Sequence, residues 1–213
     1  VGFMYGSLKS REWWSSDLMP VIFLFSAIIS GVSLLAVLYV VTCKLRKIPV
    51  DLGCLKGLAY TIWAFIMVAL VLEGLEFANI VYKGREGVDM IMEYVTGPLL
   101  VPYFILQFAI GAITPFLVLS YMIWRGTTGK ALVVGVTVCA CLVLFSVFMM
   151  RWNVVIGGQE ISKTGKGLLS YHMPLFGKEG ALVAIALTLA PLGLLYVLTR
   201  LFPPWDDKAT DAH

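Results

Sequence analysis

The chain has 213 residues, of which 60% are hydrophobic and 14% are charged, and its mean hydropathy is +0.90. Soluble domains are roughly 45–50% apolar and about 25% charged, so the composition excludes an ordinary soluble domain and predicts an all-α integral membrane protein. The formal net charge of +3 is small and no basic run is present, which excludes a nucleic-acid-binding surface.

Five apolar segments alternate with polar connections, and they predict five transmembrane helices. We expect four of them to form one bundle and the last to pack outside it as a peripheral helix. The predicted parts are an interfacial linker (1–18), transmembrane helices 1–4 (19–153), a long extracytoplasmic loop (154–180), transmembrane helix 5 (181–204) and a cytoplasmic tail (205–213). In the first helix, Ser26, Ser30 and Ser33 form a small polar face that favours close helix packing.

The second apolar segment, Leu58–Tyr82, contains two carboxylates, Glu73 and Glu76, which lie three residues apart and share a helix face. An ionisable group within a membrane span costs roughly 2.5–3.5 kcal/mol on insertion scales. Such a group normally faces the interior of a bundle, a wet cavity or a partner. The two residues are therefore candidates for a proton relay, and the alternative is a structural hydrogen bond between helices.

The third segment, Pro98–Trp124, contains Tyr103, Gln107 and an interior proline, Pro115, which should kink the helix. Gln107 lies nine residues after Pro98, and Glu73 lies nine residues before Tyr82. Both side chains are then roughly 13 Å below the same membrane surface. Because consecutive spans run antiparallel, we expect Glu73 and Gln107 to meet, with Tyr103 and Gln107 in a polar or quinone-proximal pocket.

The fourth segment, Ala131–Met150, is followed by Arg151 and Asn153, which are further candidates for the same pocket. Arg151 either orders the connection that follows through its several hydrogen-bond donors or contacts a quinone or a partner protein. Within that connection, Gln159 and His172 are candidates for docking a partner. A lone histidine such as His172 is more often structural than a proton carrier.

The orientation follows from lysine and arginine in the short loops. The number of lysine and arginine residues is eight on each side of the membrane. One side, however, concentrates them in the loops Lys44–Lys56 and Arg125–Lys130. We therefore predict that this side and the C-terminus are cytoplasmic and that the chain lies in the inner membrane.

Histidine and cysteine usage argues against a resident metal or haem. Neither His172 nor His213 lies in an apolar span, and no CxxCH motif is present. Cys139 and Cys141 lie two residues apart in a helix and point to different faces, so they cannot chelate together.

Two stretches carry a resemblance to a known family. RWNVVIGGQEISKTGKG (Arg151–Gly167) and YGSLKSREWWSSDLMPVIFLFSAIISG (Tyr5–Gly31) resemble segments of NrfD-like proteins, the family of the polysulfide reductase membrane subunit. The match is nearest to the ten-helix members, including the sulfite-reduction-associated and hydrogenase branches. With no methionine at Val1, the chain looks like the C-terminal half of such a member.

The resemblance implies a subunit that passes electrons between menaquinone-type quinone and an extracytoplasmic, ferredoxin-like iron–sulfur subunit within a respiratory complex. The family binds no haem or metal itself. Its quinone site is generally placed in the first bundle, so no quinone-contact residue is carried onto this chain. Three alternatives stay open: a proton-conducting module, a cation transporter with Glu73 and Glu76 as the ion site, and a purely structural anchor.

Overall fold

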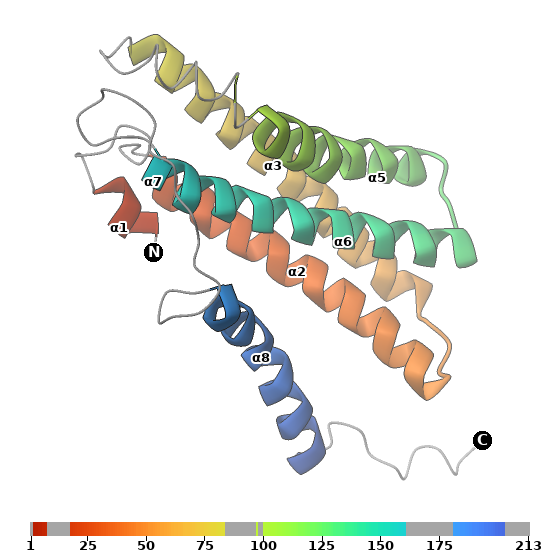
Figure 1. The fold of residues 1–213 in the computed structure, drawn as a ribbon. Coiled ribbons are helices and arrows are strands. Elements are labelled where there is room, and N and C mark those ends of the chain that lie inside the picture. Colours follow the sequence, from red (N-terminus) through yellow and green to blue (C-terminus); the bar gives the residue numbers. More distant parts are fainter. Residues whose placement is uncertain (1, 8–17, 84–96, 98–99, 161–180, 203–213) are drawn as a thin grey trace. The chain divides into compact units, whose positions relative to one another are not determined.

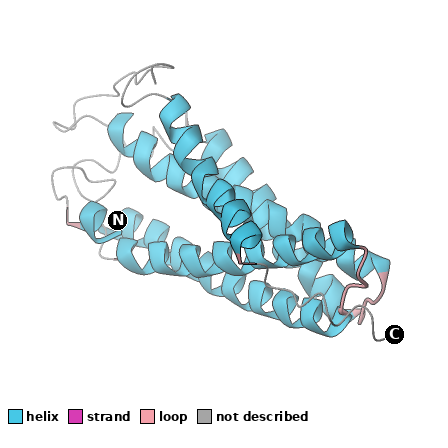
Figure 2. Ribbon diagram, turned by 90° about the horizontal axis from the view of Figure 1, so that it is seen from below, coloured by secondary structure: helices cyan, strands magenta, loops and turns pink. Residues whose placement is uncertain are grey.

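The computed structural model describes residues 2–7, 18–83, 97, 100–160 and 181–202, and in these ranges the chain is almost entirely helical. The helices are α1 (Gly2–Gly6), α2 (Met19–Arg46), α3 (Leu52–Lys83), η1 (Leu100–Ile113), α5 (Thr114–Trp124), α6 (Lys130–Trp152), η2 (Asn153–Gly157), α7 (Gly158–Glu160) and α8 (Ala181–Leu201). Figure 1 shows the course of the chain, and Figure 2 shows that helices dominate the described parts. The protein is an all-α membrane protein, as the composition predicts.

Within the part of the chain that the structure describes, four helical segments are long and apolar enough to cross a membrane: Met19–Arg46, Leu52–Asn79, Leu100–Trp124 and Lys130–Gly157. In the first compact unit of the chain, residues 1–169, α6 packs against η1, α2 and α5, and α2 also packs against α3 (Figure 1). This arrangement confirms the four-helix bundle. The short helix α1 precedes the first span and lies against α2.

The bundle has an apolar interior and an apolar exterior. Its interior contains the buried side chains of Ile29, Ala36, Leu55, Ala59, Ile62, Ile66, Leu119, Met122, Leu132, Val136, Cys139, Ala140 and Val143. Outward-facing residues such as Leu35 and Val134 are 60% and 62% exposed. A soluble monomer rarely exposes apolar surface on this scale, whereas lipid chains solvate it without cost. The packing therefore agrees with a membrane environment.

The connection between α2 and α3 has identifiable stop and start signals. Lys47 adopts a left-handed conformation with φ of 58°, and Ile48 N–H donates to Cys43 O at 3.0 Å, which ends α2. Asp51 Oδ1 then accepts a hydrogen bond of 2.8 Å from Gly53 N–H, which satisfies one free donor at the start of α3. This short connection holds α2 and α3 antiparallel.

Pro115 divides the third span into two different helices. The chain is a π-helix from Leu100 to Ile113 and an α-helix from Thr114 onward, with Pro115 in the first turn of α5. A proline has no N–H and clashes with the carbonyl four residues before it, so the wider π-turn accommodates it. The structure shows a change of helix type here, and the kink that the sequence indicates at Pro115 stays a prediction.

The fourth span extends beyond the sequence-based boundary. A polar connection is expected to start at residue 154, but the chain stays helical through η2 and α7 to Glu160. The reason is that Asn153 and Val154 are buried in the bundle, together with Gly157 and Gly158, which need little space. The connection therefore starts later than the apolar pattern indicates.

Residues 170–213 form a second compact unit, and its described part is α8 with Pro191 in its interior. The apolar part of α8, Ile185–Leu201, is shorter than the four long spans. The fifth predicted segment is thus helical. Its crossing of the membrane and its place outside the bundle remain predictions, and the tail 205–213 lies outside the described residues.

Candidate functional site

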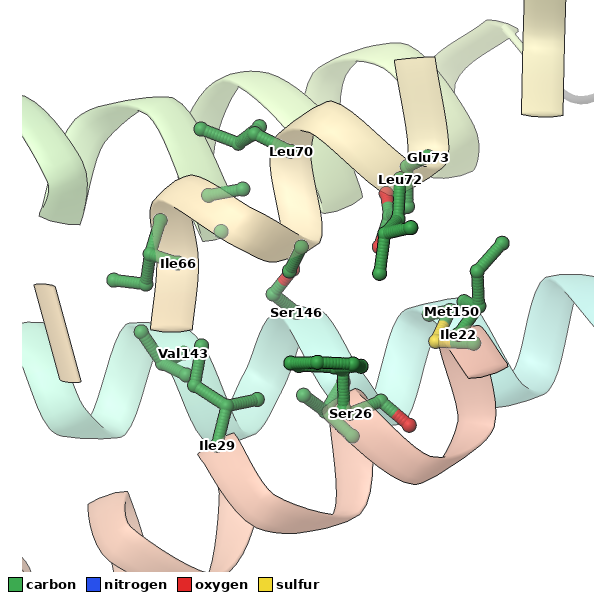
Figure 3. Close-up of a pocket in the computed structure, with 15 residues that line it drawn as sticks. Ile22, Ser26, Ile29, Ile66, Leu70, Leu72, Glu73, Val143, Ser146 and Met150 are labelled. Carbon is green, nitrogen blue, oxygen red and sulfur yellow. The ribbon is translucent and has the colours of Figure 1, made fainter. Parts of the chain in front are cut away.

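Glu73 lies on the inward face of α3 near the centre of the bundle. Figure 3 shows its carboxylate pointing into the space between α3 and the facing helices α2 and α6. An ionised carboxyl group is costly to bury in such surroundings unless donors or water reach it. The neighbours of Glu73 therefore decide what it can do.

Gln107 of η1 is the direct partner of Glu73. Its Nε2 donates a hydrogen bond of 3.1 Å to Glu73 Oε2, and its side chain is only 2% exposed. The contact confirms the expectation, drawn from equal depth below one membrane surface, that the two side chains meet. It links the second and third spans through polar side chains.

Asn153 extends this contact to a third helical segment, η2. Its Nδ2 donates to Gln107 Oε1 at 2.9 Å and to Pro102 O at 3.3 Å, and the residue is 2% exposed. Ser146 of α6 adds a bond of 3.1 Å from its Oγ to the main-chain oxygen of Gln107. Glu73, Gln107 and Asn153 thus form a continuous hydrogen-bonded chain across the bundle, which we call the polar chain.

Both amides of the polar chain lie in π-helical segments, Gln107 in η1 and Asn153 in η2. A π-turn contains an extra residue, so it shifts side chains relative to an α-helix, and such turns are frequent at functional sites. In η1 the Pro102 carbonyl also accepts a hydrogen bond of 3.3 Å from Asn153 Nδ2. The unusual backbone is therefore part of what assembles the polar chain.

Two small cavities meet at Glu73. One, of about 40 Å³, is lined by polar groups of Glu76, Tyr103, Gln107 and Asn153 as well as Glu73. The other, of about 30 Å³, continues between α2, α3 and α6 past Ser26 and Ser146 (Figure 3). A water molecule needs roughly 10–15 Å³ of such space and several polar partners. Each cavity is thus large enough for a few water molecules.

Glu76, the second proton-relay candidate, and Tyr103, a candidate for the polar pocket, lie beside the polar chain. Both line the larger cavity. The Tyr103 ring contacts Phe104 and Phe108, each with a centroid separation of 5.3 Å, and Phe104 contacts Phe77 at 6.0 Å. Tyr103 thus belongs to a cluster of aromatic rings that joins α3 and η1.

Three other candidates have different surroundings. Arg151 is exposed and does not line either cavity, so the structure does not bring it to the polar chain. Gln159 is partly buried, and no hydrogen-bond partner for its Oε1 exists in the described ranges. His172 lies outside the described residues.

Sequence reasoning missed two contributors to this site, Ser146 and the Pro102 carbonyl. Ser146 is one of several small residues in α6, and nothing in the pattern marks it. Its position follows from Gly111 of η1, where a Cβ atom would overlap the Cβ of Ser146. Only the close approach of η1 and α6, which Gly111 permits, brings Ser146 to Gln107.

Comparison with known proteins identifies relatives of this chain. The sequence profile of the family described as "Polysulphide reductase, NrfD" matches residues 1–162. A selenate reductase subunit from Mesobacillus selenatarsenatis is 31% identical over 157 residues, which is 73% of this chain and 35% of the relative. The chain thus spans about a third of the length of that protein. No solved structure matches the chain. Because the family profile covers most of the chain, including the whole four-helix bundle and its polar chain, the protein belongs to the NrfD family of multi-pass membrane proteins.

Proposed function

We propose that the protein containing this chain is a quinone-interacting membrane subunit of a respiratory oxidoreductase complex. It exchanges electrons between a menaquinone-type quinone in the membrane and an iron–sulfur subunit on the extracytoplasmic side. Family membership and the name of the relative, a subunit of a reductase, support this proposal. The concentration of bases in the loops Lys44–Lys56 and Arg125–Lys130 supports an inner-membrane location with those loops and the C-terminus in the cytoplasm.

Within that function, the four-helix bundle handles protons. Oxidation of a quinol releases protons together with electrons, and reduction of a quinone takes them up, so the protein needs groups that transfer protons. The observation that supports this role is the position of Glu73, which is hydrogen-bonded to Gln107 and lies between two water-sized cavities. Burial disfavours the charged form of the Glu73 carboxyl group, whereas the hydrogen bond from the Gln107 amide favours that form. This balance suits a group that gains and loses a proton.

The cavity beside Glu76 and Tyr103 measures about 40 Å³, a size that suits water molecules. We place the quinone outside the bundle interior, and we assign no ligand of the ring to these residues. Glu73 acts on protons that reach it through water.

A second candidate function is cation transport, because Glu73 and Glu76 line one cavity. Two carboxylates with amide oxygens nearby are the kinds of ligand that hard cations prefer. The described residues contain no group of three or more His, Cys, Asp or Glu side chains placed to hold a metal ion. The proton role is therefore the better supported of the two.

The test is turnover of the assembled complex carrying Glu73→Gln. The amide keeps the size of the side chain and its hydrogen bond to Gln107 but cannot carry a proton. We expect normal assembly and quinone-linked turnover slower by about tenfold or more, since a positioned acid–base group contributes roughly a hundredfold or more. Asp51→Asn is the matched control, because it removes a carboxylate that caps α3 outside the bundle interior.

The outcomes separate the candidate functions. Normal turnover and normal proton coupling in the assembled Glu73→Gln complex would leave only a structural role for the polar chain. A dependence of turnover on sodium or potassium that disappears in Glu73→Gln would favour the cation site. Failure of an iron–sulfur subunit to co-purify would contradict the proposed electron transfer.

A further inference from the structure

A third cavity lies at the opposite end of the bundle from Glu76, where α3 begins and α5 ends. It measures about 40 Å³, and its polar rim is made by Lys56, Tyr60, Gly126 and Thr127. Its floor is apolar and includes Leu119 and Val136, which are 1% and 0% exposed. The cavity thus combines a polar opening at the level of the loops with an apolar base inside the bundle.

The rim presents hydrogen-bond donors that the protein leaves unused. Among the described residues, no acceptor engages the ammonium group of Lys56, the phenol of Tyr60 or the hydroxyl of Thr127. Lys56 and Tyr60 lie one helical turn apart on α3, so their side chains share a face. Thr127 approaches from the turn between α5 and α6, where its own N–H donates to Met122 O at 3.1 Å. Three donors from two segments therefore border one opening.

The two loop segments at this end of the bundle are rich in basic residues. The two loop segments 44–56 and 125–130 contain six basic residues, namely Lys44, Arg46, Lys47, Lys56, Arg125 and Lys130, and one acid, Asp51. The Asp51 carboxylate already accepts a hydrogen bond from Gly53 N–H at 2.8 Å. Six bases against one acid leave an excess of positive charge in these segments, which attracts an anion.

We propose that this cavity is a binding site for one anionic phospholipid of the phosphatidylglycerol type. The phosphate accepts hydrogen bonds from Lys56, Tyr60 and Thr127, and an acyl chain follows the apolar side of α3 and α5 below them. Basic openings between transmembrane helices at the level of the headgroups are a known form of anionic lipid recognition. Free phosphate would contact only the polar rim of the cavity. A zwitterionic lipid would be attracted less strongly by the cationic loops.

The test is lipid binding by the intact complex that contains this chain, measured by native mass spectrometry during titration with phosphatidylglycerol. We expect Lys56→Gln to lower the affinity for phosphatidylglycerol about fivefold, because one Lys near the membrane surface contributes about that factor to binding. Thr127→Val should weaken it less, and Lys56→Arg should preserve it. Lys44→Gln is the matched control, since it removes the same charge from the last turn of α2, away from the cavity.

Each result has a fixed meaning. A selective loss in Lys56→Gln, with unchanged thermal unfolding and with phosphatidylcholine binding weakly, supports the site. Equal losses in Lys44→Gln and Lys56→Gln would overturn it, because only general charge attraction would remain. Equal retention of phosphatidylcholine would overturn it as well. Displacement of the lipid by inorganic phosphate alone would show a phosphate site without lipid recognition.

Discussion

Glu73 of α3 and Gln107 of η1 are joined by a hydrogen bond of 3.1 Å in the interior of the bundle. The orientation of the Gln107 amide is determined on both sides, because its Nε2 faces the carboxylate and its Oε1 accepts from Asn153 at 2.9 Å. The polar chain therefore has a direction, from the donor Asn153 to the acceptor Glu73. Gln107 therefore connects Glu73 to the start of η2 by hydrogen bonds.

Removal of Asn153 should destabilise the bundle more than removal of an outlying hydroxyl. In Asn153→Ala, Gln107 Oε1 and Pro102 O both lose their donor in a buried setting. We expect a loss of about 1–2 kcal/mol, within the range for buried polar groups and for interhelical bonds in membranes. Reversible unfolding in mixed detergent measures it. Ser30→Ala is the control, because Ser30 bonds only to Ala27 O in its own helix, and an equal loss in both variants would contradict the account.

The close approach of η1 and α6 depends on Gly111. A Cβ atom at this position would overlap the Cβ and Cα atoms of Ser146, which cannot move without shifting α6. Gly111→Ala should therefore lower the midpoint of thermal unfolding and separate Ser146 from Gln107. Gly135→Ala is the matched control, since its new methyl group meets only the flexible end of Met122. Equal thermal stability of the two variants would show that the helices are not packed as described.

The antiparallel arrangement predicts that two distant loops lie on one side of the membrane. Ile48 follows α2 and Thr128 follows α5, and both are exposed. With the four native cysteines replaced by alanine, Ile48→Cys and Thr128→Cys should react with an impermeant thiol reagent from the same side. Tyr82→Cys, near the other end of α3, should react only from the opposite side. Labelling of Ile48→Cys and Thr128→Cys from different sides would contradict the four-span topology.

Much of the fold is predictable because lipid imposes long apolar helices, and the depth of a residue in an antiparallel pair follows from counting. That is why the Glu73–Gln107 contact is predictable from the sequence. The π-helical turns are not, since they depend on how Pro115 and Asn153 fit against neighbouring helices. The continuation of the fourth span past Asn153 is missed for the same reason: its polar amide looks like the start of a loop until Gln107 and Pro102 supply its partners.

The central claim is that Glu73 gains or loses a proton during quinone-linked turnover. Redox-induced infrared difference spectroscopy of the assembled complex measures this directly, because a protonated carboxyl group has a separate C=O stretching band that shifts in heavy water. The account predicts such a band on addition of quinol, present in the unaltered complex and in Asp51→Asn, and absent in Glu73→Gln. The same carboxyl band persisting unchanged in Glu73→Gln would contradict it.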